Sequence, residues 1–204
     1  MAVLALIVLA YLCGSIPTGV WLAWRRGVDP RDIGSGNIGA TNVARAAGNT
    51  AGVLTLVGDI LKGLLPVALA THLGVGDVGL ALVALAAFTG HLYPCFLGFE
   101  GGKGVAVTLG VLLGLAPFAM AFAVPTFLLT VAITRYVSLG SILAAAVTPV
   151  VVAALGYPHP TTLVALIMSV WIGFRHRDNI RRIRFGTEAR IGGRPSTFPD
   201  SGYA

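Results

Sequence analysis

The sequence GHLYPCFLGFEGGKGV, residues 90–105, joins the end of one apolar run to the start of the next. Pro94 and Gly98 interrupt the first run, and Gly-Gly-Lys-Gly follows at residues 101–104. Closely spaced glycines remove the Cβ atoms that would keep a ligand away from backbone N–H groups, and a helix that starts just after them adds a positive end. With Lys103 inside it, the loop predicts a seat for a phosphate group. The alternative interpretation is a tight cytosolic turn whose lysine only marks the positive side of a membrane.

The composition indicates an integral membrane protein. Of the 204 residues 56% are hydrophobic and 11% are charged, whereas a soluble domain carries about 25% charged residues. The net charge of +6 at pH 7 therefore concerns membrane orientation and anionic ligands, and we expect no nucleic-acid partner. The two cysteines, Cys13 and Cys95, lie in apolar runs and are expected to be free thiols.

Apolar runs define the expected membrane spans, because about 20 residues are needed to cross a bilayer. They cover residues 3–24, 51–73, 78–97, 105–134, 139–155 and 161–174. We expect the first run to be a retained span that continues unbroken, because it has no basic leader of the kind that precedes a cleaved signal. The run at 105–134 contains Pro117 and Pro125, and by length alone it could form one long helix or two short ones.

The distribution of basic residues favours two short helices. If the run at 105–134 turns near Ala116–Pro117, all flanking basic groups lie on the cytoplasmic side, as the positive-inside rule requires. We therefore predict an all-α, polytopic membrane protein with seven transmembrane helices and short cytosolic re-entrant or interfacial segments. The N-terminus is expected outside and the C-terminus in the cytoplasm. Residues 1–190 would form a single seven-span domain and residues 191–204 a polar C-terminal tail.

This topology brings four polar segments to one face, at residues 34–45, 98–104, 135–141 and 175–188. Each segment has an ordinary explanation on its own, as a solvated loop, a tight turn, a helix cap or a positive-inside stop that contacts anionic lipid. These explanations account for the arginines of the last segment but not for His176 and Asn179, which lie three residues apart and share a helical face.

The motifs in these segments resemble those of a known family. They are Ser-Gly-Asn-x-Gly-Ala-Thr-Asn at 35–42, Gly-His-x-x-Pro-x-Phe with Gly-Gly-Lys-Gly-Val at 90–105, and Arg-His-x-x-Asn-Ile-x-Arg with Gly-x-Glu at 175–188. They are similar to the three cytosolic motifs of the bacterial acyl-phosphate-dependent glycerol-3-phosphate acyltransferases. The resemblance implies transfer of a fatty acyl group from acyl phosphate to the sn-1 hydroxyl of glycerol 3-phosphate. The products would be lysophosphatidic acid and phosphate, in the first step of phospholipid biosynthesis at the bacterial inner membrane.

The resemblance also implies roles for individual residues. The catalytic group would be His176, Asn179, Lys103 and Ser35. Substrate would be bound by Arg45, Asn37, Thr41, Asn42, Gly101, Gly102, Gly104 and Ser141. The general base stays open between His176 and a phosphate oxygen of the substrate. Because an acyl phosphate is already activated and the chain has no Asp/Glu cluster, we expect no cofactor and no metal. The expected partners are glycerol 3-phosphate, acyl phosphate and membrane lipid, and the protein is expected to be a monomer.

Four further polar residues are interpreted as structural. Asp59 and Lys62 lie three residues apart inside the second span, where a buried ion pair is expected. Glu188 is expected to pair with a nearby arginine, and His91 to support the glycine loop from below. The spacing His72-x4-Asp77 is a base–orienter pattern of other acyltransferases, but the charge argument puts it on the opposite side of the membrane. The competing function is a small anion or metabolite transporter, since such carriers also use broken helices and glycine loops.

Overall fold

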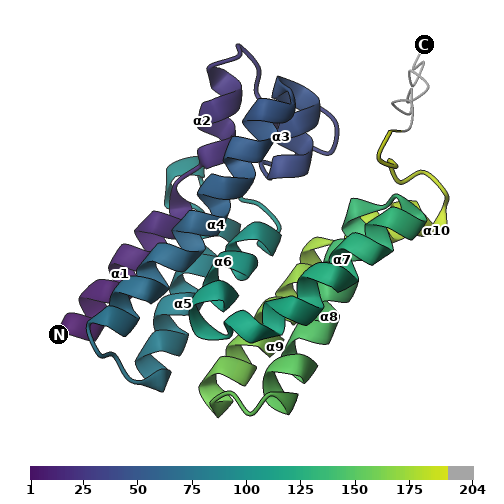
Figure 1. Cartoon of the computed structure of the whole chain (residues 1–204). Helices are drawn as coiled ribbons and strands as arrows, with labels where there is room; N and C mark the ends of the chain where they lie inside the picture. Colours follow the sequence, from purple (N-terminus) through teal and green to yellow (C-terminus); the bar gives the residue numbers. More distant parts are fainter. Residues whose placement is uncertain (193–204) are drawn as a thin grey trace, which may run out of the picture.

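The computed structural model describes residues 1–192, and all regular structure within them is helical (Figure 1). The helices are α1 (Ala2–Ser15), α2 (Thr18–Trp24), α3 (Ala40–Ala47), α4 (Asn49–His72), α5 (Asp77–Leu92), η1 (Cys95–Leu97), α6 (Val105–Leu115), η2 (Pro117–Ala119), α7 (Met120–Thr134), α8 (Val137–Ala154), α9 (His159–Arg175) and α10 (Arg177–Arg184), where η marks a 3₁₀ turn. The prediction of an all-α protein is confirmed for this part of the chain. Residues 193–204, most of the expected polar tail, lie outside the described residues.

Five segments of the described chain are long and apolar enough to cross a membrane. They are Ala2–Trp24, Asn49–His72, Asp77–Leu97, Pro117–Thr134 and Val137–Ala154. The helices α6 and α9 are shorter, with 11 and 17 residues. These apolar spans confirm an integral membrane protein by length and composition.

Apart from the short link between α1 and α2, the connections between helices lie at two opposite ends of the molecule (Figure 1). The α4–α5 turn, η2 and the α8–α9 turn lie at the same end as the N-terminus. The other end, which we call the polar end, carries residues 25–48, 93–104, 135–136 and 176–192. With the exception of Lys62, every Lys and Arg among the described residues belongs to the polar end or to the last residue of α9 beside it.

The apolar run at 105–134 breaks where the charge pattern predicted. The helix α6 ends at Leu115, Ala116 leaves the helical conformation with φ −146° and ψ 62°, and Pro117 opens the turn η2. A proline disfavours the α conformation of the residue before it, so the pair Ala116–Pro117 is a natural boundary. Pro125 lies inside α7 without ending it.

The first apolar run differs from the expectation of an unbroken helix. Ile16 is extended, with φ −58° and ψ 118°, and Pro17 separates α1 from α2. Pro17 has no N–H with which to continue the helix. The carbonyl group of Ile16 instead accepts a hydrogen bond from Lys62 Nζ at 2.9 Å. A buried lysine on α4 therefore stabilises the break in the first span.

Close packing of helices determines where the polar end is assembled. A Cβ atom on Gly90 of α5 would overlap the carbonyl oxygen of Tyr11 on α1, so the helices approach more closely than larger residues would allow. On another side of α5, a buried cluster that includes Phe88, Leu92, Met168 and Ile172 joins α5 to α9. This cluster places the last turn of α9 beside the end of α5, so that the segment after α9 meets the loop after α5.

Candidate active site

The glycine loop, residues 98–104, is shaped by its contacts with α5. The N–H of Gly102 donates to the carbonyl oxygen of His91 at 3.1 Å. A Cβ on Gly102 would overlap the imidazole of His91, and a Cβ on Gly101 would overlap the carbonyl oxygen of His91. Gly104, with φ 84°, precedes α6 and would overlap the ring of Phe88. Close packing against α5 therefore explains why these three positions are glycine. That their N–H groups contact a phosphate stays a prediction.

Arg175, at the end of α9, binds the same loop from the other side. Its Nε donates to the carbonyl oxygen of Gly102 at 3.1 Å, and its Nη2 donates to the carbonyl oxygen of Gly101. The guanidinium presents donors in a planar fork, which suits two acceptors held at a fixed spacing. The loop is therefore fixed to the third motif, at residues 175–188, as well as to α5.

A chain of hydrogen bonds continues from the loop into α10 and beyond. Lys103 Nζ donates to Asn179 Oδ1, and Asn179 Nδ2 donates to Glu188 Oε1 at 2.6 Å. Ser138 Oγ, on α8, donates to the same carboxylate oxygen at 2.6 Å, and Arg182 Nε donates to Glu188 Oε2 at 2.7 Å. We call these five residues the polar cluster. It joins three of the four segments that the sequence predicted to lie together.

Charge and burial set the protonation states in and near the cluster. Burial, with the positive charges of Arg182 and Arg175, lowers the pKa of Lys103 to about 8. Burial would raise the pKa of Glu188, but hydrogen bonds from Ser138, Asn179 and Arg182 outweigh it and hold the pKa below its ordinary value. At neutral pH the cluster therefore combines a protonated lysine with an ionised carboxylate.

His176 lies next to this cluster, between α9 and α10, and is 3% exposed. Its Nδ1 lies 2.7 Å from the carbonyl oxygen of Ile172, which assigns the ring proton to Nδ1 and leaves Nε2 as an acceptor. Burial and the charge of Lys103 lower the pKa of His176 to about 4. The imidazole is therefore neutral at neutral pH and can accept a hydrogen bond through Nε2.

The first predicted segment, residues 34–45, is organised around Asn42. The buried amide of Asn42 donates to the carbonyl oxygens of Pro30 and Ile33 at 2.7 and 3.0 Å, and its Oδ1 accepts from the N–H of Ser35 at 3.0 Å. Asn37 caps the following turn by accepting from the N–H of Gly39 at 2.8 Å. Asn42 and Asn37 therefore fix the backbone of this segment.

The other predicted residues of this segment, Ser35, Thr41 and Arg45, have exposed side chains at the polar end. Among the described residues, no hydrogen bond or ion pair joins this segment to the polar cluster. Ser141 is buried on α8, and its hydroxyl donates to the carbonyl oxygen of Val137 at 3.0 Å. The structure thus brings together the second, third and fourth segments by direct contact and places the first at the same end.

Three residues that contribute to the site were not predicted as site residues. The third quoted motif contains Arg175 and Arg182 but no role was assigned to either, and the hydroxyl of Ser138 was expected only to cap a helix. A pattern of charge or periodicity gives no sign that a particular arginine binds loop carbonyls or a carboxylate. Only the third motif contained a signal, because Arg175 adjoins His176 and Arg182 lies three residues after Asn179.

Three of the four residues interpreted as structural, Asp59, Lys62 and His91, form a buried group below the loop, whereas Glu188 pairs with Arg182 in the polar cluster as expected. Lys62 Nζ and Asp59 Oδ1 are 2.8 Å apart, with side chains 5% and 3% exposed. Thr18 Oγ1 donates to the same oxygen of Asp59 at 3.1 Å. His91 Nδ1 lies 3.9 Å from that oxygen and, although buried, has no hydrogen-bond partner among the described residues.

His72 and Asp77 lie away from all of these groups. Both are exposed, and they flank the α4–α5 turn at the end opposite to the glycine loop (Figure 1). The helix α5, with 16 residues, separates Asp77 from that loop, a distance of about 24 Å along its axis. Neither residue can act together with Lys103 in this arrangement.

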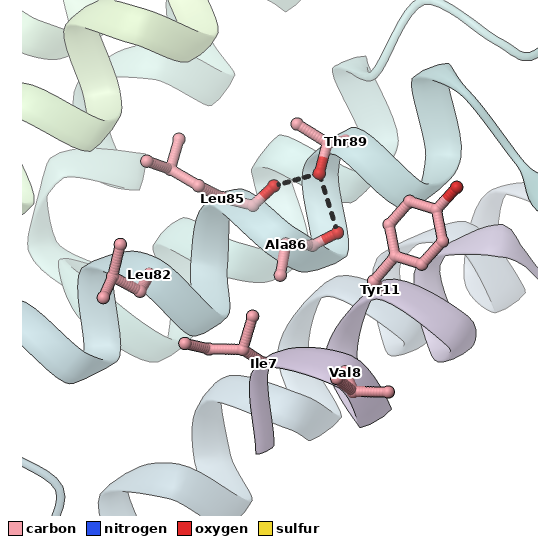
Figure 2. Close-up of a pocket in the computed structure, with 7 residues that line it drawn as sticks. All are labelled: Ile7, Val8, Tyr11, Leu82, Leu85, Ala86 and Thr89. Carbon is pink, nitrogen blue, oxygen red and sulfur yellow. Dashed lines mark hydrogen bonds between the residues drawn. The ribbon is translucent and has the colours of Figure 1, made fainter. Parts of the chain in front are cut away.

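The surface also contains an apolar groove between α1 and α5, of about 440 Å³ (Figure 2). Its lining residues are Ile7, Val8, Tyr11, Leu82, Leu85, Ala86 and Thr89. The hydroxyl of Thr89 points back to carbonyl oxygens of its own helix, at 2.8 Å from that of Leu85. The hydroxyl of Tyr11 likewise donates to the carbonyl oxygen of Tyr93 at 2.8 Å. The groove therefore offers hydrocarbon contacts and no charged side chain, so we do not interpret it as a second phosphate site. Within residues 1–192, no three His, Cys, Asp or Glu side chains come together as a metal site.

Comparison with known proteins gives a consistent result. A family model for glycerol-3-phosphate acyltransferase matches residues 4–186. A protein of Geobacter sulfurreducens named glycerol-3-phosphate acyltransferase is 54% identical over 188 residues, which cover 92% of this chain and 97% of that protein. The crystal structure of PlsY (YgiH), an integral membrane glycerol 3-phosphate acyltransferase, is similar in its glycerol 3-phosphate form, with a TM-score of 0.90 and 42% identity over 93% of this chain and 96% of that one. In its lysophosphatidic acid form the TM-score is 0.87, with 41% identity over 93% of this chain and 95% of that one. With matched motifs, fold and length, the chain belongs to the glycerol-3-phosphate acyltransferase family.

Proposed function

We propose that this protein transfers a fatty acyl group from an acyl phosphate to the sn-1 hydroxyl of glycerol 3-phosphate, at the cytoplasmic face of the bacterial inner membrane. Membership of the family supports the acceptor and the reaction class. That the donor is an acyl phosphate is the more specific part of the proposal. It is supported by a site that offers groups for phosphate, the Lys103 ammonium and the Arg175 guanidinium beside the glycine loop.

The observation that carries the proposal is the junction of Lys103 with Asn179. The ammonium group of Lys103 lies where the glycine loop meets the third motif. It is next to the start of α6 and close to the Arg175 guanidinium. Two phosphate-bearing substrates bring several negative charges together, and a site for them must neutralise that charge and hold a hydroxyl against a carbonyl carbon. Ser35, Thr41 and Arg45 at the same end would complete the binding of the acceptor phosphate.

The chemistry requires no covalent enzyme intermediate. The acceptor hydroxyl oxygen attacks the acyl carbonyl carbon, the bond from that carbon to the phosphate oxygen breaks, and inorganic phosphate leaves. With a pKa of about 4, His176 is a weak base, whereas the second pKa of a phosphate monoester is about 6. We therefore assign the hydroxyl proton to a phosphate oxygen of the substrate and give His176 Nε2 the task of orienting the hydroxyl.

A donor comparison with purified protein tests this function. Lysophosphatidic acid should form from glycerol 3-phosphate with acyl phosphate as donor and not with acyl-CoA of the same chain length. Equal rates with both donors would contradict the assigned donor. Uptake of radiolabelled glycerol 3-phosphate into proteoliposomes, without any acyl product, would instead favour the transporter.

We also propose seven spans, with α1–α2, α4, α5, α6, α7, α8 and α9 crossing in turn, a single domain over residues 1–190 and a monomer. The short α6 and α9 would be accommodated by burial in the bundle and local thinning of the bilayer. The gathering of basic residues at the polar end supports a cytoplasmic C-terminus and an external N-terminus.

Thiol labelling in intact cells tests the orientation. In a Cys13→Ala, Cys95→Ala background, a membrane-impermeant maleimide should label Asp77→Cys in intact cells. It should label Arg31→Cys and Arg184→Cys only after permeabilisation, since all three positions are exposed but lie at opposite ends. Labelling of Arg184→Cys from outside would refute the orientation.

The pKa of Lys103 predicts how activity depends on pH. Because this pKa is about 8, the ammonium loses its proton as the pH rises through that value. The ratio kcat/KM for glycerol 3-phosphate, which reports ionisations of the free enzyme, should then fall about tenfold per pH unit. The Lys103→Arg protein should have a lower rate but no such fall up to about pH 10, because arginine stays charged. A constant kcat/KM in the unmodified protein between pH 7 and 10 would contradict the prediction.

A further inference from the structure

We propose that Arg175 and His91 are positioning residues that hold the Gly101–Lys103 backbone between them and so set the direction of the loop's N–H groups and of the Lys103 side chain. The inference rests on the proposed use of the loop as a phosphate seat. Neither side chain is required to touch substrate.

The two hydrogen bonds of Arg175 decide which way the peptide groups face. Both carbonyl oxygens that it binds, those of Gly101 and Gly102, are turned toward the guanidinium. In a trans peptide the N–H points in the direction opposite to the preceding carbonyl, and the described chain contains no cis peptide. The N–H of Lys103 is therefore turned away from Arg175. Without the guanidinium, free carbonyl oxygens would be able to rotate toward a bound anion and repel it.

On the side opposite to Arg175, the backbone of residues 101–103 packs against His91. The N–H of Gly102 is used by the carbonyl oxygen of His91, and the imidazole fills the space that a Cβ on Gly102 would need. His91 is 3% exposed and lies above the Asp59–Lys62 pair, which is tied to the break in the first span. The loop backbone is therefore held by His91 on one side and by Arg175 on the other. Lys103 is the next residue after Gly102, and its side chain reaches Asn179.

Replacement of Arg175 by lysine separates geometry from charge. Lysine keeps the positive charge but cannot donate from two nitrogens in one planar fork. We expect the Kd for glycerol 3-phosphate, measured by isothermal titration calorimetry without acyl donor, to rise about tenfold or more, as loss of one charge-assisted contact allows. The matched control is Arg184→Lys, an exposed arginine of α10, which should leave the Kd unchanged. An Arg175→Lys protein with unaltered Kd would overturn the proposal.

A double-mutant cycle tests whether the packing of His91 against Gly102 positions the loop. Gly102→Ala and His91→Ala should each weaken glycerol 3-phosphate binding, the first because its Cβ overlaps the imidazole and the second because the imidazole no longer supports the loop. In the double variant the added Cβ fills part of the space that the imidazole leaves, so its loss of binding free energy should be smaller than the sum of the two single losses. The control Gly173→Ala, where a Cβ meets nothing within 4 Å, should bind normally. Additive losses in the double variant, or a His91→Ala protein that binds normally, would show that the packing of His91 against the loop does not position it. Unmodified protein that binds glycerol 3-phosphate but does not use acyl phosphate would refute the donor and leave this inference to be judged on binding. Unmodified protein that binds none would overturn both.

Discussion

The Asn179→Ala protein, correctly folded, is expected to lose acyltransfer activity by about 100-fold or more, the range seen when one preorganised polar group is removed from an active site. Asn179 accepts from Lys103 and donates to Glu188, so truncation leaves the lysine without its acceptor and removes one of the three donors to the carboxylate. The His176→Ala protein should lose activity to a similar degree, because the neutral imidazole acceptor next to the cluster is gone. Initial rates with acyl phosphate and glycerol 3-phosphate measure both effects.

The His72→Ala and Asp77→Asn proteins provide the comparison. Both positions are exposed at the opposite end, and their spacing is the one that a motif search for other acyltransferases would select. We expect both to keep the activity of the unmodified protein. Size-exclusion profiles and thermal transitions in detergent show whether each variant is folded. Loss of activity at His72 and Asp77, with activity kept at His176 and Asn179, would move the active site to the other end and refute the proposed function.

The helices were predictable because hydropathy is a local property of the sequence. Apolar runs gave the spans, and the basic residues decided that the run at 105–134 must turn near Ala116–Pro117, as the structure has it. The break at Pro17 was missed for a different reason. Pro66, Pro125 and Pro149 lie inside helices without ending them, so proline alone does not mark a break. The break is stabilised by Lys62, a contact between residues 46 positions apart.

The site was predictable as a set of segments but not as a set of contacts. The resemblance of the motifs to a known family named Lys103, His176 and Asn179 together as site residues. No sequence pattern shows that the N–H of Gly102 is used by the carbonyl oxygen of His91, or that Arg175 takes two loop carbonyls. Such contacts depend on how α5 and α9 pack. The contacts of Arg175 join residues 73 and 74 positions apart, and local sequence patterns do not record such packing.

The Lys103→Ala protein is expected to lose about 100-fold or more in kcat/KM for glycerol 3-phosphate. A hydrogen bond to a charged group contributes about 1.5–3 kcal/mol, and each 1.36 kcal/mol corresponds to about tenfold. The loss should exceed one such contact, because the side-chain oxygen of Asn179 also loses its donor. Steady-state kinetics at about pH 7, below the pKa of Lys103, measures the effect with the lysine of the reference protein charged.

Charge alone would predict a different result, and a matched variant separates the two explanations. The Arg184→Ala protein loses one positive charge from the same end, but Arg184 is exposed and screened by solvent. If the polar end attracts anionic substrate only through its overall charge, both variants should lose activity by a similar small factor, and the loss should shrink as salt is added. If Lys103 contacts substrate phosphate within the glycine loop, its loss should be much larger and should persist at high salt, because a buried contact is screened far less than an exposed one. Similar losses in both variants would show that the glycine loop is the tight cytosolic turn of the alternative interpretation and not a phosphate seat.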